Sequence, residues 1–140
     1  MIDQITVFLE NNRGRLAALA RTLGEADISM HALTVADTSE YGVVRIIADT
    51  PVRACEVLNA KGFRASITKV FAVEVVDHSG GLAALLDALD AAGLNVEYAY
   101  CFAIEGGKAV DVLRIDTRDE AAAVIVDAGF RVMNPSELYA

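Results

Sequence analysis

The sequence predicts an α+β protein made of two copies of one β-α-β-β-α-β unit, with antiparallel sheets side by side and the helices of each unit on one sheet face. The first observation is an internal repeat, because Gly14 lies 66 positions before Gly80 and the same offset aligns the apolar residues that follow. The aligned leucines are Leu16, Leu19 and Leu23 with Leu82, Leu85 and Leu89. The second observation is that strand and helix patterns follow one another in the same order in both copies.

Each copy begins with alternating apolar residues, at positions 5–9 and 71–75, which indicate a strand. Apolar residues at i, i+3, i+4 and i+7 then predict one buried helical face: Leu16, Leu19, Ala20 and Leu23 in the first copy, and Leu82, Leu85, Leu86 and Leu89 in the second. Gly24 and Gly93 mark the ends of these helices. Second strands are expected at 28–37 and 94–104, and apolar third strands at 43–48 and 109–115 should be central.

Second helices are predicted to begin at Pro51 and Thr117, and short last strands to follow Gly62 and Gly129. This order is that of the ferredoxin-like arrangement, a four-stranded antiparallel sheet with both helices on one face. We therefore expect two domains, residues 1–68 and 69–140, joined by a connection at 66–70 that is too short for free tethering. Units of this size usually need support from a neighbour.

Composition and charge narrow the classes of partner. The chain has 140 residues, of which 54% are hydrophobic and 23% charged, as in a folded globular protein. Its net charge of −8, with no basic stripe, argues against nucleic acid as a partner. Polar residues near the N-terminus argue against a leader or a membrane span, so a cytoplasmic location is expected. Cys55 and Cys101 are expected to be free, buried thiols.

A glycine precedes the first helix of each copy, in the loops 11–15 and 77–81. Glycine allows backbone N–H groups to approach a ligand closely, and the positive end of a helix favours an anion such as a carboxylate. The alternative is that Gly14 and Gly80 only permit a tight turn from strand to helix.

The pattern Asn11-x-x-Gly14-x-Leu16, with Leu19, Leu23 and the run 26–29, resembles the ACT domain, a small regulatory module that binds amino acids. The second copy repeats the pattern, and the resemblance extends from Ile5 to Met133. It is that of a stand-alone tandem ACT protein. Arg13 and Ser79 stand where the family often has proline, a departure that concerns the identity of the ligand more than the fold.

The resemblance implies that a free amino acid lies between two ACT domains, with the loop of one and the second strand of the other as walls. The first implied pocket combines Asn11, Asn12, Arg13, Gly14 and Leu16 with Asn95, Val96, Glu97 and Tyr98. The second combines His78, Ser79, Gly80 and Gly81 with Ser29, Met30 and His31. Backbone N–H groups and Arg13 would hold the carboxylate, and Glu97 or an Asn side chain would meet the ammonium.

Some of these side chains have other interpretations. His31 and His78 are candidate metal ligands, but they occupy unmatched positions and a structural role is favoured, so no metal is expected. Tyr98, Tyr100 and Phe102 alternate on a strand, where they would stack on an aromatic ligand or lie in a core or subunit interface. We expect a non-catalytic allosteric regulator without a cofactor, assembled as a homodimer and able to act on a metabolic enzyme. The alternatives are a ligand-free interaction subunit and a small enzyme with a histidine base.

Overall fold

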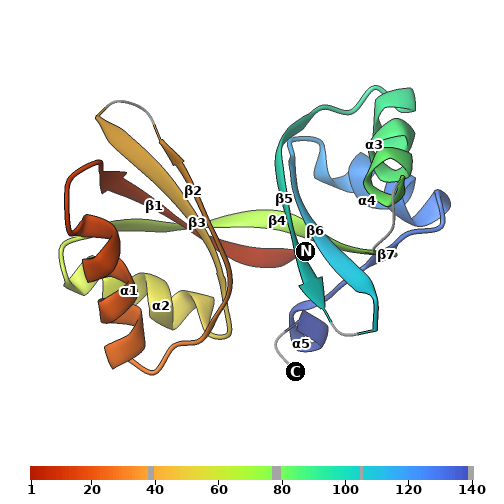
Figure 1. The fold of residues 1–140 in the computed structure, drawn as a ribbon. Coiled ribbons are helices and arrows are strands. Elements are labelled where there is room, and N and C mark those ends of the chain that lie inside the picture. Colours follow the sequence, from red (N-terminus) through yellow and green to blue (C-terminus); the bar gives the residue numbers. More distant parts are fainter. Residues whose placement is uncertain (38–39, 77–79, 105, 139–140) are drawn as a thin grey trace. The chain divides into compact units, whose positions relative to one another are not determined.

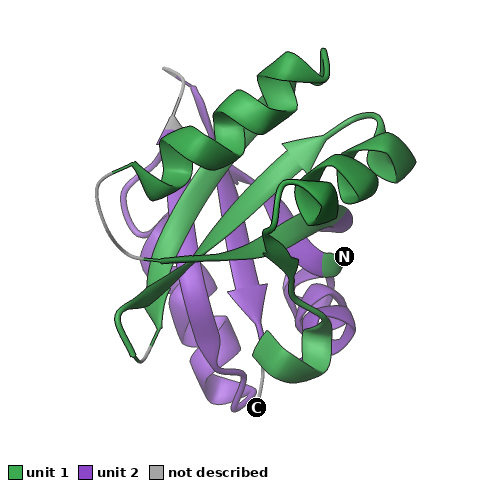
Figure 2. Cartoon of the chain, turned by 90° about the vertical axis from the view of Figure 1, so that its right-hand side faces the viewer, with its two compact units in different colours: residues 1–2, 69–138, 140 green, residues 3–68, 139 purple. Residues whose placement is uncertain are grey.

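The computed structural model describes residues 1–37, 40–76, 80–104 and 106–138. The chain divides into two compact units, which Figure 2 shows in different colours. One unit consists of residues 3–68, and the other of residues 69–138 together with Met1 and Ile2.

The unit of residues 3–68 contains four strands and two helices. Its elements are β1 (Ile2–Glu10), α1 (Arg15–Glu25), β2 (Met30–Asp37), β3 (Tyr41–Ala48), α2 (Pro51–Ala60) and the first part of β4 (Arg64–Val76). The strand order is β2-β3-β1-β4, and β3 pairs antiparallel with both β1 and β2. The third strand is therefore central, as its apolar composition predicts.

The unit of residues 69–138 has the same order of elements. They are the second part of β4, α3 (Gly81–Ala91), β5 (Val96–Ile104), β6 (Lys108–Ile115), α4 (Arg118–Asp127), β7 (Arg131–Val132) and α5 (Pro135–Leu138). The strand order is β7-β4-β6-β5, which is equivalent to that of the other unit. Two βαββαβ units with antiparallel strands confirm the predicted fold class. The short α5 was not predicted.

One strand differs from the prediction. The sequence indicates a short last strand in the first copy and a separate first strand in the second, but β4 runs through both as 13 consecutive residues. Residues 66–70, expected to be a connection, lie inside this strand. No proline or glycine interrupts residues 64–76, so nothing in this segment ends the extended backbone.

The core of each unit lies between the sheet and its two helices (Figure 1). In the first unit Ile5, Val7 and Leu9 of β1 point toward α1 and α2, where Leu19 and Leu23 are fully buried. Leu85 and Leu89 occupy the same positions in the other core. The predicted helical faces are therefore correct at these four leucines.

Three residues of the predicted buried faces are exposed, one in the first turn of each helix and one further along α1. Leu16 and Leu82 are 41% and 42% exposed, and Ala20 is exposed as well. Both leucines follow directly on the loop from the first strand, where the helix has not yet reached the buried core cluster. An exposed leucine therefore stands beside the loop in each unit.

The cysteines also differ from expectation. Both are free, but Cys55 is only half-buried and Cys101 is exposed, so neither is a buried core thiol. Partial burial raises the pKa of the Cys55 thiol, which the Asn59 side chain lowers to a smaller extent. Cys101 lies on β5, the last strand in the order of its sheet, where alternate residues stay uncovered.

We predict that Leu19→Ala and Leu85→Ala each lower the free energy of unfolding by about 2–5 kcal/mol, because each empties a fully buried site. Urea unfolding of both variants measures the change. Leu16→Ala is the matched control, because its partly exposed side chain should cost much less. Equal losses in all three variants would contradict this assignment of the buried face.

Candidate functional site

The helices that follow the loops both begin at a glycine with a left-handed backbone. Gly14 has φ of 89° and precedes α1, and Gly80 has φ of 96° and precedes α3. Each N-cap residue is a glycine, and among the described residues no side chain caps either helix start. In α1 the Arg15 N–H donates to the Asn12 carbonyl oxygen at 3.2 Å, so the loop backbone already satisfies the first N–H group of this helix. A positive φ strongly favours glycine, and the N-terminal end of a helix attracts an anion.

Three of the predicted ligand residues come together in the unit of residues 3–68. Asn11, Asn12 and Leu16 line one hollow of about 100 Å³. The remaining walls are Leu9, Glu10, Val35 and Gly42. A water molecule occupies about 30 Å³ of the liquid, so the hollow is large enough for the head group of a small ligand but not for a whole large amino acid.

The sequence reasoning missed Val35 and Gly42. Val35 lies opposite Val44 on β3, and Gly42 lies opposite Leu9 on β1, so strand pairing brings both to the loop. The two residues are distant from the loop in sequence. The predicted alternation of side chains along the strands was the signal in the sequence that could have indicated that these two residues lie at the loop.

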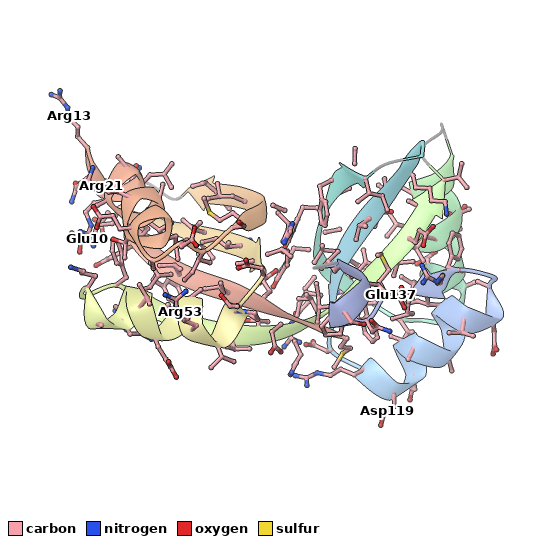
Figure 3. All side chains as sticks on the ribbon, turned by 90° about the horizontal axis from the view of Figure 1, so that it is seen from below. Glu10, Arg13, Arg21, Arg53, Asp119 and Glu137 are labelled. Carbon is pink, nitrogen blue, oxygen red and sulfur yellow. The ribbon has the colours of Figure 1, made fainter. Side chains whose placement is uncertain are left out.

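Arg13 and Arg15 have different surroundings. Arg13 is exposed and extends outward beyond the start of α1 (Figure 3). It is not among the residues that line the hollow. The guanidinium of Arg15 instead lies 4.6 Å from the centre of the Phe63 ring. This cation–π contact joins the start of α1 to the residue just before β4.

The second strands carry a matching irregularity at their beginnings. The pairing of β2 with β3 shifts between Met30 and Ala32, which leaves His31 as an extra residue. The pairing of β5 with β6 shifts in the same way between Val96 and Tyr98, around Glu97. Bulges redirect side chains and are frequent next to functional sites, and here they fall on two predicted ligand residues.

The candidate residues of these strands differ in exposure. Ser29, Met30, His31, Asn95 and Glu97 are exposed, and Val96 and Tyr98 are half-buried. The Glu97 carboxylate forms an ion pair with the Arg114 guanidinium at 3.4 Å, so its charge already has one partner. The same arginine donates a hydrogen bond to the Lys69 carbonyl oxygen at 3.1 Å.

Strand pairing places the loop and the bulge at opposite ends of each sheet. In the first unit Leu9, beside the loop, pairs with Gly42, whereas Met30 pairs with Ala48 at the other end of β3. Six residues of extended chain separate these ends by roughly 20 Å. One unit therefore does not bring its own loop and bulge together around a small ligand.

Only Gly80 and Gly81 of the equivalent loop in the other unit are described, and Gly81 has surroundings of its own. His78 and Ser79 lie outside the described residues, and Gly80 is exposed. Gly81 is buried, and a Cβ atom at this position would lie 2.8 Å from the Val76 carbonyl oxygen. The first unit has Arg15 at the equivalent position, so the two loops are not interchangeable.

A buried carboxylate is a further residue that the sequence reasoning missed. Asp111 is 2% exposed on β6, opposite Val73 of β4 and Cys101 of β5, and its Oδ2 atom has no hydrogen-bond partner among the described residues. Burial raises the pKa of this carboxyl group. The equivalent residue of the first unit is Val44, which is fully buried in the core.

Comparison with known proteins decides the family. The model of the ACT domain pair matches residues 1–140. This chain belongs to the ACT domain pair family. The ACT pair is similar to the crystal structure of protein BT0572 from Bacteroides thetaiotaomicron, with 31% identity, a TM-score of 0.91, and coverage of 98% of this chain and 94% of that one. No curated protein matches the sequence.

Two more distant structures share the fold of this ACT pair. The regulatory subunit of aspartate kinase from Thermus thermophilus, in its ligand-free form, has 18% identity and a TM-score of 0.66, with coverage of 91% of this chain and 92% of that one. The regulatory subunit from Thermus flavus has 17% identity and a TM-score of 0.62, with coverage of 90% and 91%.

The described part of the ACT pair lacks both a metal cluster and a membrane-spanning helix. Residues 1–37, 40–76, 80–104 and 106–138 contain no group of three His, Cys, Asp or Glu side chains placed to hold a metal ion. None of the helices in these ranges is long and apolar enough to cross a bilayer.

We predict that Asp111→Val raises the free energy of unfolding at pH 7 by about 1–3 kcal/mol, because it removes a buried acceptor without a partner. The pKa of Asp111 is higher in the folded chain, so its penalty is absent below the unfolded pKa. The penalty grows as the pH rises through the unfolded and then the folded pKa. Urea unfolding between pH 3 and pH 8 measures both effects.

The exposed Asp87→Val on α3 serves as the matched control and should show no such gain. A less stable Asp111→Val protein at pH 7, or a gain that does not grow with pH, would contradict the prediction.

Proposed function

We propose that this ACT pair is a non-catalytic regulatory protein that binds a free amino acid between its two repeats. The observation that carries the proposal is the group of Asn11, Asn12 and Leu16 around one hollow beside the start of α1. The helix N–H groups offer donors to a carboxylate, and the asparagine amides offer both donors and acceptors. Leu16 adds an apolar wall.

The second half of the proposed site comes from the other repeat. A loop and a bulge of one unit lie at opposite ends of its sheet, so a ligand that touches both needs two units. We propose that Glu97 and its neighbours Asn95, Val96 and Tyr98 complete the pocket of Asn11, and that Ser29, Met30 and His31 complete that of Gly80 and Gly81. In this arrangement Glu97 accepts the ammonium group of the ligand.

The two pockets should differ in affinity. The first contains two asparagines and a hollow next to Leu16, whereas the second has Gly81 packed against the Val76 carbonyl. We propose that the asparagine-lined pocket is the stronger one. The protein would then respond to the concentration of one amino acid through this one site.

The regulatory part of the proposal is supported by proteins of the same fold. The structures from Thermus thermophilus and Thermus flavus are regulatory subunits of aspartate kinase. For the present chain we propose assembly as a homodimer and action on a metabolic enzyme through a second surface. Amino-acid binding would then change the affinity for that partner, and by linkage the partner would change the affinity for the amino acid.

A ligand-free interaction subunit is the second candidate function. The observation in its favour is the row of exposed apolar side chains on β2, namely Met30, Leu33 and Val35. This strand is the last in the order of its sheet, and such strands offer side chains and backbone groups to another chain. An amino-acid screen separates this candidate from the first.

The screen measures thermal unfolding of the full chain with each of the twenty amino acids. A ligand at about 100 times its dissociation constant adds about 2.7 kcal/mol to the free energy of unfolding, so a binding amino acid should raise the melting temperature clearly. No shift with any amino acid at 10 mM would contradict the sensor function and favour the interaction subunit.

We predict that Asn11→Ala and Glu97→Gln weaken binding of the amino acid found in the screen and that their effects are not additive. Groups on one ligand commonly couple by about 0.5–3 kcal/mol, whereas separate sites add to within about 0.3–0.5 kcal/mol. A double-mutant cycle by calorimetric titration measures the coupling. Glutamine keeps the shape of Glu97 while removing the charge that pairs with Arg114.

Asp87→Ala, on an exposed part of α3, is the control and should leave affinity unchanged. Strict additivity, or a loss from only one of the two substitutions, would mean that the loop of one repeat and the bulge of the other do not share a ligand.

A further inference from the structure

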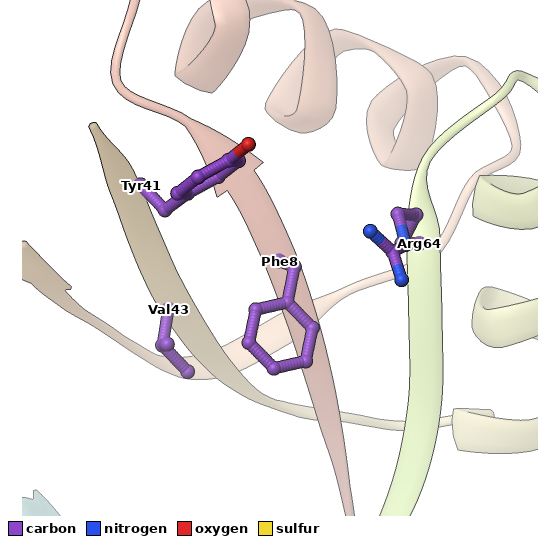
Figure 4. A pocket seen from close by; sticks show the side chains of 4 residues that line it. All are labelled: Phe8, Tyr41, Val43 and Arg64. Carbon is purple, nitrogen blue, oxygen red and sulfur yellow. The ribbon is translucent and has the colours of Figure 1, made fainter.

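A second hollow lies on the sheet face of unit 3–68 that the helices leave open. It has a volume of about 340 Å³ and is lined by Phe8, Tyr41, Val43 and Arg64 (Figure 4). Phe8 alternates with Val7 and Leu9, which point into the helix-covered core, so Phe8 faces the opposite way. The Phe8 and Tyr41 side chains are each 54% exposed. None of these four residues belongs to the proposed amino-acid site.

The other unit of the ACT pair fills the same positions with an ion-pair network. Strand pairing makes Glu74, Lys108, Val110 and Arg131 equivalent to the four residues of the hollow. The Glu74 carboxylate pairs with Lys108 Nζ at 2.7 Å and with Arg131 Nη1 at 2.5 Å. Arg131 also pairs with Glu137 of α5. Lys108 first, and then Arg131, lower the pKa of Glu74, so this carboxylate stays charged.

The first unit has an arginine, Arg64, at the position of Arg131, but it has no carboxylates at the positions of Glu74 and Glu137. Phe8 occupies the position equivalent to Glu74, and Tyr41 the position equivalent to Lys108. No helix equivalent to α5 follows, because β4 continues as a strand. Glu10 lies beside the hollow but forms no ion pair with Arg64 in the described structure. Among the described residues no carboxylate forms an ion pair with the Arg64 guanidinium, so its N–H donors can bind an external carboxylate.

We propose that this hollow binds a small free monocarboxylate that carries an aromatic or branched apolar group. Arg64 would hold the carboxylate through two parallel N–H···O bonds. The ligand would then supply the anion that Glu74 supplies to Arg131 in the other unit. Phe8, Tyr41 and Val43 would contact the apolar group, with the aromatic rings in offset or edge-to-face contact. The volume lies within the range of small-molecule pockets.

A free small molecule fits these observations better than a protein surface does. A stable protein interface usually involves about 20–30 residues on each side. Here two aromatic rings and one cation, which has no ion-pair partner among the described residues, converge on a hollow of ligand size. In the other unit a single carboxylate, that of Glu74, pairs with both cations at the equivalent positions. The replacement of Glu74 by Phe8 removes the internal anion and leaves space for an external one.

The test uses 3-phenylpropionate as the probe, with the full chain and calorimetric titration. We expect the anion to bind and the neutral 3-phenylpropanamide to bind at least tenfold more weakly, because only the carboxylate pairs with Arg64. Arg64→Gln should weaken binding of the anion at least tenfold. Arg131→Gln is the matched control at the equivalent position and should leave binding unchanged.

A second variant returns the missing internal carboxylate to the hollow. Phe8→Glu should remove detectable binding of 3-phenylpropionate, because the introduced anion pairs with Arg64 as Glu74 does with Arg131. Backbone amide shifts in NMR spectra of the wild-type chain should locate the probe at Phe8, Tyr41 and Arg64. Circular dichroism and the melting temperature verify that each variant is folded.

Three results would overturn the proposal: no binding of the anion at 10 mM, equal affinity of wild type and Arg64→Gln, or shifts confined to residues 11–16. If the probe does not bind to the wild type and Phe8→Glu changes the sedimentation coefficient, then a protein partner, rather than a small molecule, covers this sheet face. The probe lacks an ammonium group, so Asn11→Ala should not affect it. A negative result with the probe therefore does not contradict the proposed amino-acid site, and a negative amino-acid screen does not contradict the proposed monocarboxylate site.

Discussion

The antiparallel pairing of the central strand in each unit is the constraint on which the arrangement of possible sites depends. Since β3 pairs with β1 on one side and β2 on the other, the loop after β1 and the bulge at the start of β2 lie at opposite ends. The same holds for β6 with β4 and β5. A small ligand therefore cannot contact the loop and the bulge of the same unit.

The two copies share the same backbone features, but their side chains differ in chemical character. The bulges at His31 and Glu97 and the left-handed glycines at Gly14 and Gly80 are features of the backbone, and both copies have them. The side chains at equivalent positions differ in charge, as Val44 and Asp111 do in the cores and Phe8 and Glu74 do on the open sheet faces. Such divergence allows one copy to bind a ligand where the other closes the equivalent place by internal pairing.

The open sheet faces show this most clearly. In one unit Glu74 satisfies Lys108 and Arg131, and α5 adds Glu137, so the charges neutralise one another within the unit. In the other, the aromatic rings of Phe8 and Tyr41 stand beside Arg64, and the continuous strand β4 leaves no terminal helix at this place. The continuity of β4 thus has a chemical consequence as well as a structural one.

The sequence by itself determined the repeat, the order of strands and helices, the family and the central place of the third strands, because periodicity and glycine positions are local properties of the chain. It also pointed to Asn11, Asn12 and Leu16, which the structure places around one hollow. Only the tertiary structure decided that Leu16 and Leu82 are exposed, that β4 is one strand, and that Val35 and Gly42 reach the loop. It likewise revealed that, among the described residues, Asp111 Oδ2 has no hydrogen-bond partner and Arg64 has no ion-pair partner. These features depend on which strands pair and in which register, and a register is set by contacts between residues that are far apart in sequence.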